Sequence, residues 1–60
     1  MTHDDLQILL DRANAANIKG NFDEAEHLAG QVIAGTTKEN EQHVSALLVI
    51  ADTARLKGDI

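Results

Sequence analysis

The sequence contains one internal repeat at a fixed offset. A run of apolar, small and turn residues in the first third of the chain returns 38 positions later (58 − 20 = 38). The matched pairs are Leu6 and Val44, Leu9 and Leu47, Leu10 and Leu48, Ala13 and Ala51, Ala16 and Ala54, Lys19 and Lys57, Gly20 and Gly58, and Phe22 and Ile60. Such a repeat is typical of stacked helical units, each of which leaves one face unburied and stacks on a neighbour. We therefore expect an all-α fold with a surface that needs a neighbour.

The length of the chain limits how much surface it can bury. A domain of 60 residues buries only about 60% of the surface that its unfolded chain exposes. Small folds often add disulfides, metal ions or further subunits. The sequence has no cysteine, which excludes disulfides and thiolate zinc sites, and one phenylalanine is its only aromatic residue. Alanine and aliphatic side chains must therefore build the core of a single domain at residues 1–60.

The charge of the chain argues against several kinds of partner. The formal net charge is −5, and the five basic residues are dispersed. Nucleic acids and anionic membranes need clustered lysine and arginine, so neither is an expected partner. The N-terminal residues lack the basic and apolar segments of a signal peptide. The longest apolar run, residues 46–51, is too short to cross a bilayer. We expect a soluble, cytoplasmic domain.

Glycines and capping residues divide the chain into three expected helices, at residues 3–19, 22–34 and 38–57. Thr2 is the expected N-cap of the first helix. Gly20 supplies the left-handed conformation that commonly ends a helix. Gly35 and Gly58 are expected to end the second and third helices by the same logic. Thr37 is the expected N-cap of the third helix.

The middle of the third expected helix, residues 44–51, is apolar on nearly every side. An apolar run with β-branched residues also fits a buried strand. However, alanines continue the helical spacing at positions 51 and 54, and no second strand exists to pair with it. A helix that is apolar on several sides is buried on several sides, and two preceding helices cover only part of it. We expect the rest to bind a following repeat or a second copy. The expected interface residues are Leu47, Val49, Ile50, Leu56 and Ile60.

The hairpin expected at residues 3–34 resembles the tetratricopeptide repeat. That family places a small residue in its first helix, glycine at the turn, and an aromatic residue and alanine at the start of its second helix. The corresponding residues here are Ala13, Gly20, Phe22 and Ala25, and the next unit begins with Ala51, Gly58 and Ile60. The resemblance covers one full repeat and the first helix of a second. It implies a fragment of an α-solenoid that binds proteins or peptides.

This sequence departs from the family pattern in three places. Its period exceeds the usual length of about 34 residues. Ala16 and Ala54 stand where a large aromatic residue is frequent, and Thr37 stands near the place of a common proline. Longer units of this kind resemble those in bacterial signalling proteins and transcription regulators.

The resemblance also implies a concave groove lined by the first helix of each unit. The polar residues at the groove positions are Gln7, Asn14, Asn17, Ser45, Asp52 and Arg55. One subgroup of the family grips C-terminal carboxylates with a lysine and asparagines. Asn14 matches one of those asparagines, but Leu10 and Val49 replace other members of the clamp. A carboxylate clamp is therefore not expected.

No pattern in the sequence predicts a catalytic, cofactor or metal site. Glu24 and His27 have the Glu-x-x-His spacing of carboxylate-bridged metal sites. One such motif lacks the remaining ligands, and a solvated helix face explains it as well. His3 and His43 are expected at the surface. Ser45 has no histidine and aspartate at a spacing that would suggest a nucleophile.

Three functional hypotheses follow. The first is a non-catalytic interaction and oligomerisation module, the N-terminal part of a bacterial signalling or regulatory protein, with a protein or peptide partner and a homodimer formed through the third helix. The second is a structural capping unit of a longer solenoid with no ligand of its own. The third is a small metal-binding helical bundle. Because the chain ends at a turn that leads into a helix in the first unit, we expect a piece of a longer array.

Overall fold

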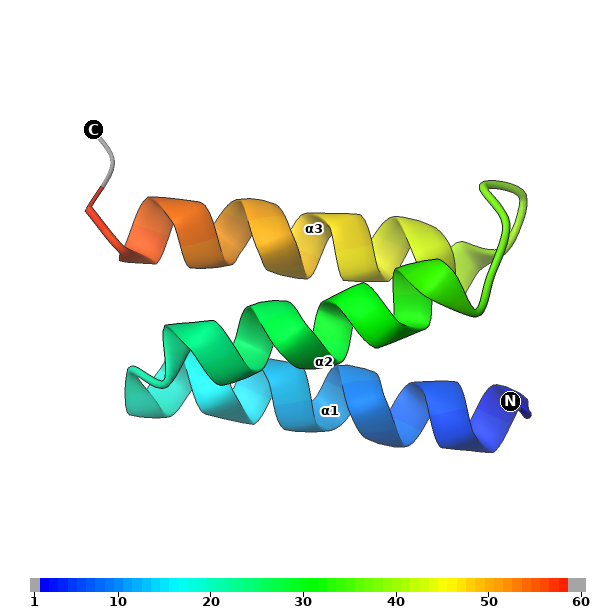
Figure 1. The fold of residues 1–60 in the computed structure, drawn as a ribbon, viewed down its shortest axis with the longest axis horizontal. Coiled ribbons are helices and arrows are strands. Elements are labelled where there is room, and N and C mark those ends of the chain that lie inside the picture. The colour runs from blue at the N-terminus through cyan, green and yellow to red at the C-terminus, as the bar shows by residue number, and fades with distance from the viewer. Residues whose placement is uncertain (1, 59–60) are drawn as a thin grey trace.

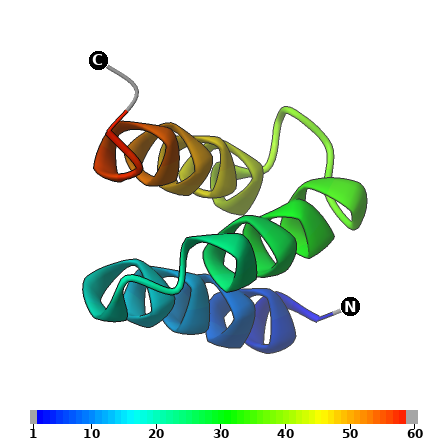
Figure 2. The same ribbon diagram turned by 60° about the vertical axis from the view of Figure 1, so that its left-hand side comes forward.

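The computed structural model describes residues 2–58 and contains three helices: α1 (His3–Lys19), α2 (Phe22–Ala34) and α3 (Glu41–Leu56). Within these residues there is no strand, so the all-α expectation is confirmed. α1 and α3 run in the same direction, and α2 runs antiparallel between them (Figure 1). The view in Figure 2 shows α1 and α3 as the two outer helices. The first two helices have the bounds that the sequence predicts.

Local capping explains the bounds of α1. The Thr2 hydroxyl accepts a hydrogen bond from the Asp5 backbone N–H at 3.1 Å, and the Asp5 carboxylate accepts one from the Thr2 N–H at 3.4 Å. This reciprocal pair is a capping box. At the other end, Gly20 has a φ of 84°. The Asn21 N–H donates to the Ala16 carbonyl at 2.8 Å, which completes a Schellman ending. The predicted N-cap and terminal glycine of α1 are both confirmed.

The connection between α2 and α3 differs from the prediction. Gly35 has a φ of −95°, so the expected left-handed conformation is wrong there. The Thr36 hydroxyl instead donates to the Val32 carbonyl at 2.6 Å and satisfies the end of α2. The N-cap of α3 is Asn40 and not Thr37, because the Asn40 side chain accepts from the Gln42 N–H at 2.7 Å. This cap delays the start of α3 from the predicted residue 38 to Glu41.

Small residues allow α2 to pack closely against both of its neighbours. Ala25 and Ala29 on α2 are fully buried, as are Ala13 on α1 and Ala46 on α3. Larger aliphatic side chains fill the space around them. The core cluster consists of Leu6, Leu10, Ala13, Leu28, Ala29, Val32, Ala46 and Val49. Burial of these side chains, with no contribution from a disulfide, supplies the main driving force for folding.

Polar contacts join α1 directly to α3 at two places, one near each end of the pair. At the N-terminal ends, the Gln42 side-chain amide donates to the His3 carbonyl at 3.0 Å and to Oε1 of Gln7 at 3.4 Å. At the C-terminal ends, the buried Thr53 hydroxyl lies 2.8 Å from Oδ1 of Asn17. A net hydrogen bond contributes only about 0.5–1.5 kcal/mol, but the two places are far apart along the helices. Together they fix the register of α3 against α1.

Candidate functional site

A groove runs between α1 and α3 and extends past the contact of Thr53 with Asn17 to the C-terminal ends of both helices. Its larger part has a volume of about 530 Å³ and is lined by Asn14, Asn17, Ile18, Asp52, Arg55 and Leu56. A second part of about 240 Å³ is lined by Gln7, Leu10, Asn14, Ser45, Leu48, Val49 and Asp52. Asn14 and Asp52 line both parts, so the two hollows adjoin, and we call them together the groove.

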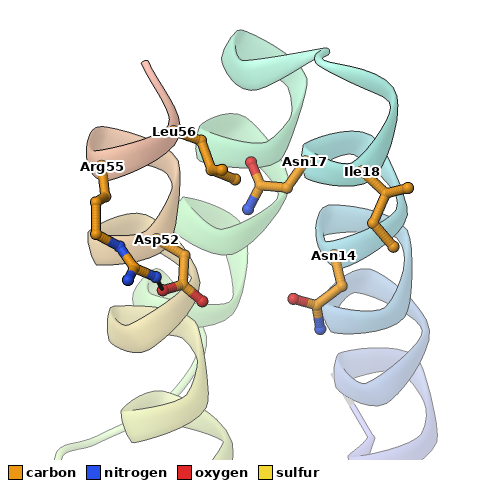
Figure 3. Close-up of a pocket in the computed structure, with 6 residues that line it drawn as sticks. All are labelled: Asn14, Asn17, Ile18, Asp52, Arg55 and Leu56. Atoms are coloured by element: carbon orange, nitrogen blue, oxygen red, sulfur yellow. Dashed lines mark hydrogen bonds and ion pairs between the residues drawn. The ribbon is translucent and has the colours of Figure 1, made fainter. Parts of the chain in front are cut away.

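The groove contains all six polar residues that the resemblance to tetratricopeptide repeats places on a concave face. Figure 3 shows the α1 side chains on one side of its larger part and the α3 side chains on the other. Asn17 is 9% exposed and is held by Thr53, so it supports the groove wall more than it faces solvent. Peptide binding in the groove stays a prediction.

Polar side chains occur along the whole groove together with apolar ones, which are Leu10, Leu48 and Val49 in the smaller part and Ile18 and Leu56 in the larger part. Asp52 and Arg55 form an ion pair at 2.5 Å, so the two charges largely neutralise each other. Ile18 is 87% exposed and Leu56 is 53% exposed at the C-terminal end of the groove. Amide and hydroxyl side chains suit contacts with an extended peptide backbone. No nucleophile and base lie in hydrogen-bonded contact among the groove residues that the structure describes.

The second candidate surface is the side of α3 that faces away from the core. It consists of Val44, Leu47, Leu48 and Ala51, which we call the outer stripe. The three large side chains are 48%, 48% and 62% exposed, and Ala51 is also exposed. Their spacing of three and four residues places them on one helix face. No part of the described chain covers this face.

The internal repeat shows how unusual the outer stripe is within this chain. Leu6, Leu10 and Ala13 of α1 are at most 4% exposed and belong to the core cluster. Their counterparts 38 residues later are Val44, Leu48 and Ala51, all of them exposed. The same pattern of side chains is therefore buried in α1 and exposed to solvent in α3.

The expected interface residues are only partly exposed. Val49 is 5% exposed within the core, so its expected place at an interface is wrong. Ile50 is half-buried against the core, so it too is less exposed than expected. Leu47 and Leu56 are about half exposed, as expected. Ile60 lies outside the described residues.

The rotation of α3 about its axis has a simple physical cause. Ala46, Val49 and Thr53 face inward at a spacing of three and four residues. Ala46 and Thr53 are small enough for α3 to approach its neighbours closely, and Thr53 also meets Asn17. The larger Leu47 and Leu48 are left outside. Leu48 is missing from the expected interface residues although it is 62% exposed, and its repeat partner Leu10 was a usable signal.

The histidines have ordinary polar neighbours. Nε2 of His27 lies 2.9 Å from the Gln31 side-chain amide, and Nδ1 of His43 lies 2.9 Å from the Thr36 hydroxyl. Nδ1 of His3 lies 3.8 Å from the Asp4 carboxylate. Across residues 2–58, no three histidine, cysteine, aspartate or glutamate side chains gather into a group that could hold a metal ion. No helix in this range has the length and apolar character needed to span a bilayer.

Comparison with known proteins finds no matching family model, no matching curated protein and no matching solved structure.

Proposed function

We propose that this chain is a non-catalytic protein–protein interaction module that associates through the outer stripe of α3. The observation that carries the proposal is the exposure of Leu48 and its apolar neighbours on one face of an ordered helix. Contiguous apolar patches on small soluble proteins usually mark interaction sites. Interface centres are also poor in charged residues, and no charged side chain interrupts the outer stripe.

The resemblance to tetratricopeptide repeats supports the same proposal. Ala13 and Ala25 are fully buried where α1 and α2 pack together, and Gly20 forms the left-handed turn between these helices. These are the roles that the family assigns to the matching positions. By this resemblance, the module is part of a cytoplasmic bacterial signalling or regulatory protein. A further reason comes from the chain itself. Leu6, Leu10 and Ala13 match residues of the outer stripe in the internal repeat, and all three are buried in α1.

The partner proposed for the outer stripe is a second copy of the same chain. Closed two-fold dimers are the commonest assemblies of soluble proteins. α3 is an outer helix of the bundle (Figure 2), and the side chains of the outer stripe are exposed. Pairing two copies through this face would bury both stripes at once.

A matched pair of variants tests the proposal. Leu48→Glu places a charge in the centre of the outer stripe, so it should reduce self-association at least about tenfold. Ile8→Glu is the control, because Ile8 is 55% exposed on α1 and lies outside the stripe. Light scattering of both variants at matched concentrations measures the effect. Equal self-association of the two variants would contradict the use of this surface.

The groove supports a second candidate function, which is capture of an extended peptide. The observation in its favour is that two adjoining hollows between α1 and α3 are lined by several polar side chains from both helices. Binding of peptides from a random library, compared between the wild-type chain and Asn14→Arg, tests it. Asn14 lines both parts of the groove, so a peptide that binds there should lose affinity when arginine fills the space. Unchanged binding would exclude the groove as the peptide site.

A further inference from the structure

Five residues of α3 follow the spacing of a coiled-coil seam. Their positions alternate in steps of three and four along the exposed side of the helix. The residues are Glu41, Val44, Leu48, Ala51 and Arg55, and all five are exposed. Steps of three and four define the a and d positions through which two helices pack side by side. The outer stripe therefore has the geometry needed to pair with another helix.

The residues of this seam complement each other when two copies of α3 are aligned in opposite directions. When two copies of α3 are aligned antiparallel with Leu48 against Leu48, facing positions sum to 96, and the seam residue nearest to Val44 is Ala51, one position from exact facing (44 + 51 = 95). The same alignment places Glu41 of each copy opposite Arg55 of the other. A large side chain thus meets a small one, and an acid meets a base, at both ends of the seam. Such complementarity of charge fixes the register and direction of a helix pair.

A parallel alignment of the same seam has the opposite effect. It places Glu41 against Glu41 and Arg55 against Arg55, and like charges at facing positions are unfavourable. The side chains around Arg55 do not prevent the antiparallel contact. Arg55 pairs with Asp52 at 2.5 Å while its side chain is 70% exposed. A guanidinium has five N–H donors, so it can bind both Asp52 and a carboxylate of another chain.

The size of the surface sets the strength of the expected contact. α3 has 16 residues, which corresponds to a length of about 24 Å at 1.5 Å per residue. A standard interface buries about 800 Å² on each partner, or roughly a fifth of this chain's surface of 3983 Å². One helix face provides less than that. The dimer is therefore expected to be reversible, with a Kd on the order of 100 µM.

We propose that two copies of this chain pair antiparallel through α3, centred on Leu48, with Glu41 of each copy facing Arg55 of the other. This arrangement rests on the proposed function, for which it specifies the partner and its orientation. It predicts a two-fold axis that passes between the two Leu48 side chains. The helix order across the assembly is α1, α2, α3, followed by α3, α2, α1 of the second copy.

Charge reversal tests the arrangement. Glu41→Arg and Arg55→Glu should each weaken dimerisation several-fold, because each places like charges opposite one another. The two variants change the net charge in opposite directions, which provides an internal control. If general repulsion between copies with a charge of −5 governed dimerisation, Glu41→Arg would dimerise more strongly. Glu39→Arg, in the exposed connection before α3, makes the same charge change outside the seam and should not weaken the dimer.

Mixing the two variants separates direct contact from helix destabilisation. In a mixed dimer, one chain carries Glu41→Arg and the other carries Arg55→Glu. One end of the seam then pairs the two substituted side chains, and the other end pairs the two unchanged ones. Both facing pairs have opposite charges, so dimerisation should recover to within about threefold of wild type, on the scale set by such pairs.

The alternative explanation predicts a different result for the mixture. A loss of helix stability would persist on mixing, because mixing changes neither sequence. Sedimentation equilibrium of each variant alone and of the equimolar mixture distinguishes the two explanations. A mixture that dimerises no better than its components would overturn the facing of Glu41 and Arg55.

Disulfide formation provides a second readout of direction. The chain has no cysteine, so Val44→Cys and Ala51→Cys each introduce a single thiol. Antiparallel pairing brings these two positions together, and the mixture should form the mixed disulfide several-fold faster than either variant forms its own. A parallel pair would instead favour the two homodisulfides. That outcome would overturn the arrangement.

The results also distinguish failure of the arrangement from failure of the proposed function. If Leu48→Glu abolishes dimerisation but neither charge reversal weakens it, α3 is the interface and the antiparallel seam is wrong. If Leu48→Glu and Ile8→Glu behave alike, the proposed interaction surface itself is wrong.

Discussion

The hydroxyl of Thr53 lies 2.8 Å from Oδ1 of Asn17, and this contact ties the C-terminal ends of α1 and α3 together in the core. Thr53 is fully buried and Asn17 is 9% exposed. The same hydroxyl lies 2.9 Å from the Val49 carbonyl one turn earlier. The contact helps to set which side of α3 faces the core, and therefore which side remains free to bind another chain.

Replacement of Thr53 by valine should destabilise the fold. Thr53→Val keeps the shape of the side chain but leaves the Asn17 amide without its protein partner, at a cost of about 1–2 kcal/mol. Urea unfolding measures this difference in the free energy of unfolding. Thr37→Val is the control, since Thr37 is exposed in the connection before α3. In the background of Asn17→Ala, the cost of Thr53→Val should shrink; an undiminished cost would show that the contact contributes nothing.

Gly20→Ala should destabilise the hairpin of α1 and α2 by more than about 1 kcal/mol, because a Cβ resists the left-handed conformation. The φ of Gly20 is 84°. Gly58 has a similar φ of 85°, but it lies beyond the last helix, so Gly58→Ala should cost less. Thermal unfolding followed by circular dichroism compares the two variants. Equal losses of stability in the two variants would contradict the role of Gly20 in the turn between α1 and α2.

Gly30→Ala should stabilise the protein. Gly30 lies inside α2, and a Cβ built at this position meets no atom within 4 Å. Alanine in a helix interior is more stable than glycine by about 0.5–1 kcal/mol. The same thermal measurement should therefore show a higher Tm. A lower Tm would mean that a close neighbour occupies the space beside Gly30.

Ala25→Leu should cost about 1–3 kcal/mol through overpacking. Ala25 is fully buried where α2 approaches its neighbours, and a larger side chain would push the helices apart. Ala15→Leu is the matched control, because Ala15 is exposed on α1. Chemical unfolding of both variants provides the comparison. An unchanged midpoint for Ala25→Leu would indicate that the packing of α1 against α2 is wrong.

The helices could be predicted because local signals in the chain agree with one another. Thr2, Asp5 and Gly20 set the ends of α1 by contacts within a few residues. The connection before α3 contains several residues that can cap a helix, and Asn40 prevails through a contact with the Gln42 N–H. A choice among such competing caps depends on where the whole helix packs, which local pattern does not specify.

The rotation of α3 could not be predicted from its own pattern. Residues 44–51 are apolar on nearly every side, so several rotations bury similar areas. The choice depends on non-local contacts, namely Thr53 with Asn17 and Gln42 with the His3 carbonyl. The polar residues of the groove were easier to place, because the resemblance to tetratricopeptide repeats assigns each of them a position on the first helix of its unit.

Light scattering of the wild-type chain over a dilution series tests dimerisation through α3 most directly. The mass should rise from that of one chain at low micromolar concentration toward that of two chains at about 1 mM, given a Kd on the order of 100 µM. Helicity followed by circular dichroism should remain the same throughout the series. A mass of one chain at every concentration, with that helicity intact, would contradict self-association through the outer stripe and favour a capping unit without a ligand.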